Sequence, residues 1–392
     1  MNVIDSDDES GAINEKKRRF FHSNGDPKEI ARDDESRGAG YNPSTYLSHV
    51  LHSLEGLDRY PNYLNRWQLT DVEKLEDSLE EKLRLVRQQK KNVQERREQI
   101  TALLKRVDMN EFPLLKEPRN WDEVRDRIMD PRASDSLLSQ FFKRKGGNGS
   151  NVPSVENVIR GEVPVELDQS RLEDWMDQEM FDVYSFPLLS SEFCSQLKGF
   201  IRHVTALGKS EEYSHLELGT RAVDLDTVGI GWLNSLILHL VMRPLARQLF
   251  KDTEELVEDL DWRHGYVNAY VSSIIPGTNQ RRRLVPHTDD AEVTINVFIT
   301  PENEVKGGNL RFWGLRGTDE QGEFVGEYEP EVGRALLHAG RHFHEVTDIE
   351  EGNRYSYIMW ARSWGGIRSS TCPCCWLNRR QDKDCICGPS WN

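Results

Sequence analysis

Apolar residues in the first third of the chain recur at the spacing expected of α-helices. A first helix is expected between Pro43 and Pro61, with its apolar positions at Tyr46, Val50, Leu54 and Leu57. A further helical pattern covers Arg119–Phe142, with apolar positions at Trp121, Val124, Ile128, Leu137, Leu138 and Phe141. The N-terminal region is therefore predicted to be α-helical.

The longest helix is predicted to run from Thr70 to about Val107, and its first residues have the capping-box pattern. An apolar residue recurs at every seventh position, at Val72, Leu79, Val86, Val93, Ile100 and Val107. The companion heptad positions are polar in the middle, at Lys82, Gln89 and Arg96. Because a stable dimeric coiled coil needs both columns apolar, we expect an exposed amphipathic helix that packs on a neighbouring element. Self- or partner association through residues 70–107 is the alternative.

The pattern changes to short alternating strands in the C-terminal half. A strand is expected at Phe181–Pro187, followed by a helix capped by Ser190 or Ser191 and a second apolar helix at Leu233–Phe250. Later strands are expected at Gly265–Ile275, Val293–Thr300, Asn309–Trp313, Gly322–Tyr328, Ala335–His338, Phe343–Thr347 and Arg354–Arg362. Many short strands separated by Gly-containing turns favour a sandwich or barrel, so the fold class is α+β.

Charge and composition exclude several classes of protein. The 392 residues carry a formal net charge of −15, with 37% hydrophobic and 30% charged residues. Nucleic-acid and anionic-membrane binders need clustered Lys and Arg, so neither partner is expected. No apolar run reaches the length of a transmembrane helix. The first residues lack a basic and then apolar signal segment, so a cytoplasmic or nuclear protein is expected.

Candidate metal ligands are concentrated between Leu284 and Trp364. His287 and Asp289 are two positions apart, so they would point to the same side if both were in one β-strand. A third ligand, His344, would come from a distant strand. Two His and one carboxylate on one side of an octahedral ion leave three positions open, which is the arrangement of non-haem Fe(II) oxygenases. Asp290 is the rival carboxylate, but in a regular strand it would face away from His287.

An anion site is predicted beside the metal site. The guanidinium of Arg354 stays charged and binds a carboxylate with two prongs, as the far end of 2-oxoglutarate would require. Ser356 alternates onto the same strand face and supplies a second polar group. His338 and His342 are expected to be structural, although His342 could compete with His344.

These residues together resemble a known family. His-x-Asp at His287–Asp289, then His344-Glu345-Val346 and Gly352–Ser356, is similar to the 2-oxoglutarate- and Fe(II)-dependent oxygenases of the prolyl 4-hydroxylase-like branch. The phrases Glu331–Leu337 and Gly307–Leu310 fit the same branch. The resemblance covers roughly Asp174–Ile367, and within the branch it is greatest to proteins named for a 2-oxoglutarate and iron-dependent oxygenase domain.

The resemblance implies a double-stranded β-helix, or jelly roll, with flanking helices. It implies Fe(II) as metal, 2-oxoglutarate as co-substrate, ascorbate as reductant and hydroxylation of a C–H bond, with a protein side chain as the expected substrate. It also implies that a tyrosine on the first barrel strand contacts 2-oxoglutarate; Tyr270 matches best and Tyr266 is the runner-up. A metal-binding jelly roll without turnover, or an interaction protein acting through its helical region, are the alternatives.

These patterns divide the chain into five segments. They are a disordered acidic N-terminus (1–42), a helical region (43–142), a linker (143–173), the oxygenase domain (174–368) and a Cys-rich tail (369–392). The tail could bind structural zinc through four thiolates, Cys372, Cys375, Cys385 and Cys387. The one-residue gap in the second pair is tighter than usual, so a reduced redox-sensitive or partner-binding tail stays open.

Overall fold

The computed structural model describes residues 72–138, 152–167, 174–216, 218, 222–250, 260–274, 280–315 and 319–363. These residues belong to two compact units, one containing residues 107–367 and the other residues 40–106. The predicted acidic disorder, the helix before Pro61 and the Cys-rich tail with its possible zinc site lie outside the described residues. In the predicted linker, the structure describes a short helix, α8 (Val155–Ile159), whose Val155 and Val158 are buried.

Helix α4 (Val72–Leu104) lies within the range predicted for the longest helix. Most of its described side chains are exposed, including Val86 at 63% and Val93 at 52% of their surface. Arg84 pairs with Glu81 and Lys91 with Glu95 on this surface. Two other residues of the same apolar column, Ile100 and Val107, are buried. Association through residues 70–107 stays a prediction.

The helical pattern at Arg119–Phe142 folds differently from the single helix expected. It is divided into two helical pieces: α5 (Trp121–Glu123) continued by the π-helical η4 (Val124–Ile128), and α6 (Pro131–Ala133) continued by the π-helical η5 (Ser134–Leu138). Pro131 is the physical cause, because the residue before proline is disfavoured in the α conformation. Asp130 accordingly is extended, with ψ of 139°, and its side chain caps the second segment.

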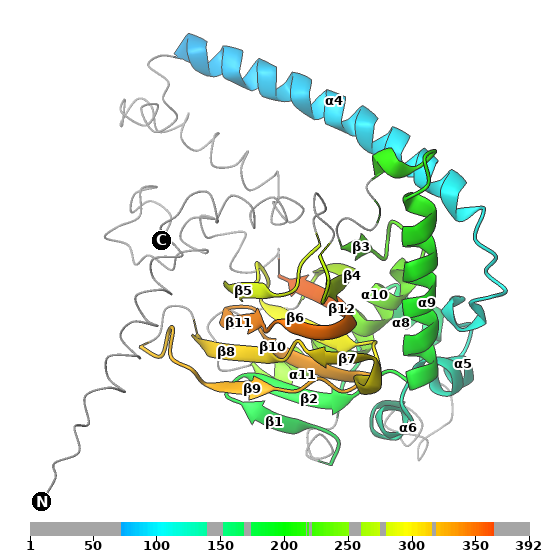
Figure 1. Ribbon diagram of the computed structural model, residues 1–392, viewed down its shortest axis with the longest axis vertical. Coiled ribbons are helices and arrows are strands. Elements are labelled where there is room, and N and C mark those ends of the chain that lie inside the picture. Colours follow the sequence, from blue (N-terminus) through cyan, green and yellow to red (C-terminus); the bar gives the residue numbers. More distant parts are fainter. Residues whose placement is uncertain are drawn as a thin grey trace, which may run out of the picture. The chain divides into compact units, whose positions relative to one another are not determined.

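Two antiparallel sheets form the body of the larger unit (Figure 1). The larger sheet has the order β1-β2-β10-β6-β12-β4-β3, with β7 paired to β12; the smaller has the order β5-β11-β8-β9. The strands of the larger sheet are β1 (Asp177–Met180), β2 (Val183–Pro187), β3 (Val223–Asp224), β4 (Trp262–Val271), β6 (Val293–Phe298), β7 (Val305–Gly307), β10 (Arg334–Ala339) and β12 (Ile349–Arg362). Those of the smaller sheet are β5 (Leu284–His287), β8 (Leu310–Leu315), β9 (Gly326–Tyr328) and β11 (His342–Val346).

The order of these strands confirms the predicted jelly roll. The chain passes between the sheets so that β4, β12, β6 and β10 are neighbours in one, and β5, β11, β8 and β9 are neighbours in the other. Each barrel strand predicted from the sequence is present, with ends that differ by a few residues. This winding makes β5 and β11 neighbours, so residues 284–287 and 342–346 lie side by side although they are far apart in the sequence.

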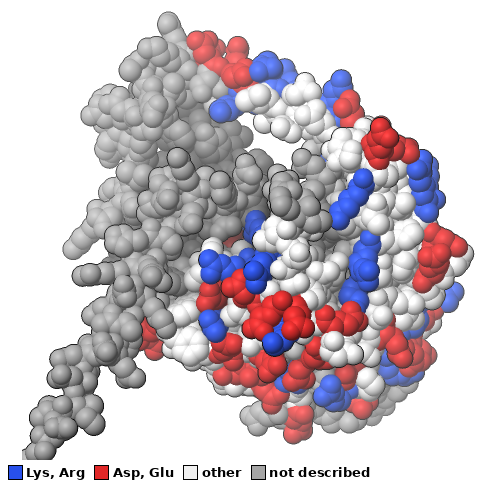
Figure 2. Space-filling model, in the orientation of Figure 1, with Lys and Arg blue, Asp and Glu red and all other residues white. Residues whose placement is uncertain are grey.

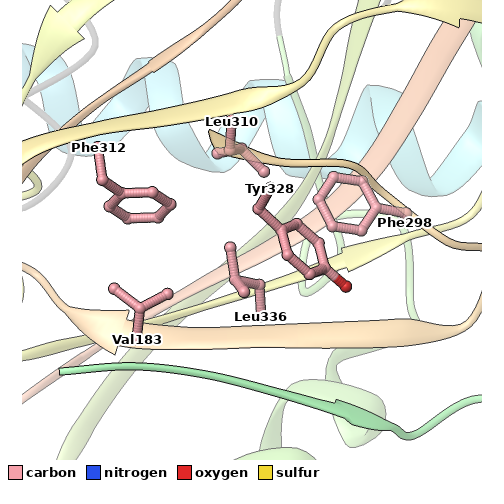
Figure 3. Packing of buried hydrophobic residues seen from close by; sticks show 6 residues of the cluster. All are labelled: Val183, Phe298, Leu310, Phe312, Tyr328 and Leu336. Atoms are coloured by element: carbon pink, nitrogen blue, oxygen red, sulfur yellow. The ribbon is translucent and has the colours of Figure 1, made fainter. Parts of the chain in front are cut away.

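Side chains from both sheets meet in the space between them (Figure 3). Phe298 of β6 packs with Tyr328 of β9, with ring centroids 6.0 Å apart. The buried cluster comprises Val183, Phe298, Leu310, Phe312, Tyr328 and Leu336. Burial of these large apolar groups holds the sheets together and excludes water from the end of the barrel they fill.

The predicted helices flank the strands (Figure 1). The side chain of Ser190 caps α9 (Ser191–Gly208) by accepting a hydrogen bond from the Phe193 amide. The apolar segment predicted at Leu233–Phe250 forms α10 (Gly231–Ile237), the π-helical segment η9 (Leu238–Met242) and α11 (Arg243–Leu249) in unbroken succession. No helix among the described residues is long and apolar enough to span a membrane. A cytoplasmic or nuclear location stays a prediction.

Candidate metal and anion site

The two candidate histidines lie directly opposite each other on adjacent strands. His344 of β11 pairs with His287 of β5, and their ring centroids are 4.4 Å apart. Each is held by its Nδ1 atom, which lies 2.9 Å from a backbone oxygen, that of Val285 for His287 and that of His342 for His344. A neutral imidazole that donates through Nδ1 keeps the lone pair of Nε2 for a metal ion.

Asp289 joins the histidines from a loop and not from their strand. Strand β5 ends at His287, so the strand alternation from which the His-x-Asp pair was predicted does not apply to Asp289. The Asp289 carboxylate lies 3.6 Å from Nε2 of His287 and 3.7 Å from Nε2 of His344. Ligand atoms of these three residues all lie within 4.8 Å of one another, a spacing that can hold a metal ion.

Hydrogen bonds orient the Asp289 carboxylate. The hydroxyl of Thr294, a fully buried residue of β6, donates to Oδ2 at 2.7 Å. The backbone amide of Asp289 donates to the Gly340 carbonyl at 2.8 Å. The carboxylate is therefore fixed by both its side chain and its main chain.

The electrostatics favour the charge states that metal binding needs. Burial alone would raise the pKa of Asp289, but the adjacent His344 and His287 outweigh it and hold the pKa well below its ordinary value. Burial also lowers the pKa of His344 well below its ordinary value, and the Asp289 carboxylate offsets this only in part. The site thus combines an ionised Asp289 carboxylate with a His344 imidazole whose neutral form is favoured.

The rival carboxylate, Asp290, is engaged elsewhere. Arg362, the last residue of β12, donates to its carboxylate at 2.8 Å and also to its backbone carbonyl. The guanidinium is fully buried and stacks on Trp262, 4.3 Å from the ring centroid. The prediction that Asp289 and not Asp290 joins the histidines agrees with this arrangement.

A cavity between the sheets connects the candidate ligands with a buried cation. Among the residues that line it are His287, Asp289, His344, Arg354, Tyr266, Asn268, Tyr270, Leu284, Asn296, Leu310, Val346 and Ile358. Arg354 is 3% exposed, and burial lowers its pKa to about 10. None of the ion pairs within the described residues includes Arg354, so a buried positive charge faces the cavity without a carboxylate partner.

The position of the Arg354 guanidinium is set by its neighbours. Its Nε donates to the Ser356 hydroxyl at 3.2 Å, and one of its terminal nitrogens donates to the Gly308 carbonyl. The Phe298 ring lies 4.6 Å away. Gly308 has φ of +82°, and a Cβ added there would lie 2.4 Å from Ile349 and 3.1 Å from Arg354. Glycine is therefore required here both for the backbone conformation and for the closeness of the arginine.

Tyr270 lies opposite Arg354 in the register of β4 and β12. Its hydroxyl is buried and makes no hydrogen bond of normal geometry to the part of the chain that the structure describes, although the Asn268 side chain is near and contributes to its pKa. Burial raises the pKa of Tyr270, so the hydroxyl is a neutral donor. Tyr266 lines the same cavity. Its pKa is raised well above the ordinary value, mainly by burial and to a lesser extent by the negative charge of Asp289.

His338 and His342 lie outside the group of three. His338 is fully buried, with its ring 4.7 Å from that of His344, and His342 contacts the Phe181 carbonyl through Nε2 at 2.9 Å. Burial lowers the pKa of His338 and lowers that of His342 to about 4, so both are neutral near pH 7. Neither histidine belongs to the cluster whose atoms are close enough to share an ion.

Three residues that contribute to the site were missed in the sequence: Thr294, Asn296 and Arg362. All three have a sequence signal in retrospect. Arg362 continues the alternation of Arg354, Ser356, Ile358 and Trp360 on one face of β12, and Thr294 and Asn296 alternate in the same way on β6. What the sequence did not show is which residue each would contact.

Comparison with known proteins agrees with the geometry. No family model matches the chain. The chain is 28% identical over 189 residues to the 2-oxoglutarate and iron-dependent oxygenase domain-containing protein ICU11 of Arabidopsis thaliana, covering 46% of this chain and 45% of that protein. It is 28% identical over 195 residues to the 2-oxoglutarate and iron-dependent oxygenase domain-containing protein 2 of Xenopus tropicalis, covering 49% of this chain and 52% of that protein.

The matches are partial. The chain spans about half the length of these curated relatives. Among solved structures, a prolyl 4-hydroxylase of Pseudomonas putida is matched over 55% of this chain and 99% of that one, with 14% identity and a TM-score of 0.28. The similarity in sequence to proteins named for the oxygenase domain, together with the strand order, agrees with the resemblance drawn from the motifs.

Proposed function

We propose that this chain is a 2-oxoglutarate- and Fe(II)-dependent dioxygenase. The observation that carries the proposal is the pairing of two sites in one cavity: a cluster of His287, Asp289 and His344, and the buried Arg354, which forms no ion pair with a carboxylate among the described residues. A barrel that merely bound a metal would not need the second site. A buried arginine costs free energy unless a partner compensates it, and a dicarboxylate bound to the metal would supply that partner.

His287, Asp289 and His344 would hold Fe(II). Two imidazoles and one carboxylate match the ligand set that suits this ion and leaves coordination positions open. With dioxygen as oxidant, a bound Fe(II) would supply the oxidation chemistry: one oxygen atom would enter the succinate formed from 2-oxoglutarate with loss of carbon dioxide, and the other would hydroxylate a C–H bond of the substrate. Ascorbate is proposed as the reductant that maintains Fe(II).

The protein's own residues would bind and orient 2-oxoglutarate. Arg354 would pair with its far carboxylate, Ser356 would hold the guanidinium in place, and Tyr270 would add a neutral donor. The apolar side chains Leu284, Leu310 and Val346 line the same cavity and would exclude water from around the carbon chain. Ion pairing in a dry cavity is stronger than in water, which favours a charged co-substrate over neutral competitors.

A protein side chain is proposed as the substrate. On the face drawn in Figure 2, acidic side chains are interspersed with the basic ones over the strands, and the whole chain has a net charge of −15. A phosphate backbone would need clustered basic side chains for affinity, so nucleic acid is not favoured. Proline or another residue with an unreactive C–H bond fits the proposed chemistry.

Anaerobic binding tests this proposal without knowledge of the substrate. Apoprotein is given Fe(II) and then 2-oxoglutarate, and the visible charge-transfer band of the iron–oxo-acid chelate is measured. The wild type is expected to give the band, His287→Ala to lose it with the metal, and Arg354→Ala to lose it while still binding metal. A wild type that binds iron but never gives the band would refute the dioxygenase and leave a metal-binding jelly roll.

A further inference from the structure

Arg362 and Asp290 form a buried contact next to the proposed metal ligands. The Arg362 side chain is 0% exposed and that of Asp290 is 18% exposed. The guanidinium binds the carboxylate and the backbone carbonyl of the same residue, so it holds the main chain as well as the side chain. The guanidinium also stacks on the Trp262 ring, which holds it in addition to the two hydrogen bonds.

Strand geometry does not keep Asp290 away from the metal position. Residues 288–292 lie between the end of β5 and the start of β6 and have no strand conformation, so the rule that neighbours face opposite sides does not apply to them. Asp290 is adjacent in sequence to Asp289, and carboxylates on neighbouring residues of a loop can reach the same ion. Some other feature must direct its carboxylate away.

We propose that Arg362 is a positioning residue that determines which carboxylate binds the metal. By holding Asp290 through two groups, it leaves Asp289 as the carboxylate beside His287 and His344 and limits the protein ligands to three. The effect on 2-oxoglutarate binding rests on the proposed function: a fourth protein ligand would occupy a coordination position that chelation of 2-oxoglutarate requires.

The surrounding backbone supports a specific role in holding the 289–292 loop. The Glu292 carboxylate accepts a hydrogen bond from the amide of Ser363, the residue after Arg362, and the Glu292 amide donates to Ala361. The end of β12 thus contacts the short segment at Glu292 as well as at Asp290. Of these contacts, the one made by the Arg362 guanidinium is the one that binds the rival carboxylate.

The experiment compares R362M, D290A and the double variant R362M/D290A, each loaded with Co(II) in place of iron. The d–d absorption of Co(II) reports its coordination, and titration with 2-oxoglutarate reports whether the chelating positions are open. We expect R362M to bind Co(II) at least as tightly as the wild type, to show an altered spectrum, and to bind 2-oxoglutarate about 10- to 100-fold more weakly. D290A should keep the wild-type spectrum, and the double variant should regain it together with 2-oxoglutarate binding.

A matched control comes from the other face of β4. Arg263 binds both oxygens of Asp226 at 2.6 and 2.8 Å, so R263M also breaks an arginine–aspartate pair, although this pair is partly exposed. It should reduce stability without changing the Co(II) spectrum. If R362M does not fold, R362Q replaces it, because glutamine can still donate to the Asp290 carbonyl while releasing the carboxylate.

The outcomes separate this inference from the proposed function. A Co(II) spectrum that stays unchanged in R362M, or that the D290A change does not restore in the double variant, would overturn the role of Arg362. That spectrum is measured before 2-oxoglutarate is added, so it is informative even if the wild type never binds 2-oxoglutarate. Failure of the wild type to bind 2-oxoglutarate would instead count against the dioxygenase.

Discussion

Arg362 holds Asp290 through both its carboxylate and its carbonyl, and Asp290 is the direct neighbour of Asp289 in the chain. Two adjacent aspartates therefore have opposite surroundings: one faces two histidines, and the other faces a buried guanidinium. Arg362 lies 72 positions after Asp290 in the sequence, and this long-range contact separates Asp290 from the candidate metal site.

Loss of Arg362 should also reduce stability. Removing one partner of a buried ion pair leaves an uncompensated charge and costs about 3–5 kcal/mol in the free energy of unfolding. We expect R362M to have this effect and the double variant R362M/D290A to lose less, as measured by urea denaturation of the apoprotein. A double variant less stable than R362M would contradict the pairing.

Thr294 should tune metal affinity. Changing it to valine keeps the shape but removes the hydroxyl that orients the Asp289 carboxylate, so metal affinity should fall about 10- to 100-fold. Competition with a chromophoric chelator measures this affinity. Thr300→Val is the matched control, because the buried Thr300 hydroxyl accepts from the Tyr355 amide away from the candidate ligands. Equal losses in both variants would point to a general effect on folding.

Arg354→Lys should separate 2-oxoglutarate binding from metal binding. Lysine keeps a positive charge but cannot bind a carboxylate with two parallel donors. Loss of one charged hydrogen bond costs about 1.5–3 kcal/mol, so the dissociation constant for 2-oxoglutarate should rise about 10- to 100-fold. Calorimetric titration of the Mn(II)-loaded protein tests this, with Mn(II) affinity expected to stay unchanged. Unaltered 2-oxoglutarate affinity would remove Arg354 from the proposed anion site.

Tyr270→Phe should weaken 2-oxoglutarate binding with little effect on stability. The Tyr270 hydroxyl has no hydrogen bond of normal geometry to lose, so the free energy of unfolding should change little. A lost hydrogen bond to the co-substrate, worth about 1 kcal/mol, would raise its dissociation constant about fivefold. Tyr266→Phe is the comparison on the same strand face. A larger effect at Tyr266 would show that the runner-up is the contacting residue.

Asp182→Asn should stabilise the protein at neutral pH. Burial raises the pKa of Asp182, and Arg341 offsets this only in part, so the folded protein holds a proton that the unfolded chain releases at lower pH. The wild type therefore loses stability as the pH rises from the pKa of Asp182 in the unfolded chain to its higher pKa in the folded protein. Below both pKa values the carboxyl is protonated in both states and causes no loss. Asparagine stays neutral and tolerates the φ of 57° found at this position.

The measurement is the urea midpoint of wild type and Asp182→Asn between pH 3 and pH 8. The advantage of the variant should be absent at the acidic end and appear as the pH rises. The exposed Asp319, changed to asparagine, is the control and should give no such trend. A constant difference at every pH would rule out the raised pKa as its cause.

The sequence by itself determined the chemical groups and the strands that carry them. The spacing of apolar positions along the chain predicted α4, α9 and most of the barrel strands. A helix or strand with one buried face needs its own characteristic spacing of apolar residues, whatever it packs against. The choice of His287 and His344 as candidate metal ligands and of Arg354 as the candidate anion-binding residue likewise followed from side-chain chemistry, since imidazoles suit metal binding and a guanidinium suits a carboxylate. Local rules failed where one residue interrupted a pattern, as Pro131 did.

Only the tertiary structure decided how those groups are combined. The sequence assigned Asp289 and not Asp290 by strand alternation, but Asp289 lies beyond the end of β5, and contacts with Thr294, Gly340 and Arg362 separate the two carboxylates. The register of β4 on β12 placed Tyr270 opposite Arg354. These relationships depend on contacts between residues far apart in the chain, and a local pattern of apolar and polar positions carries no information about such partners.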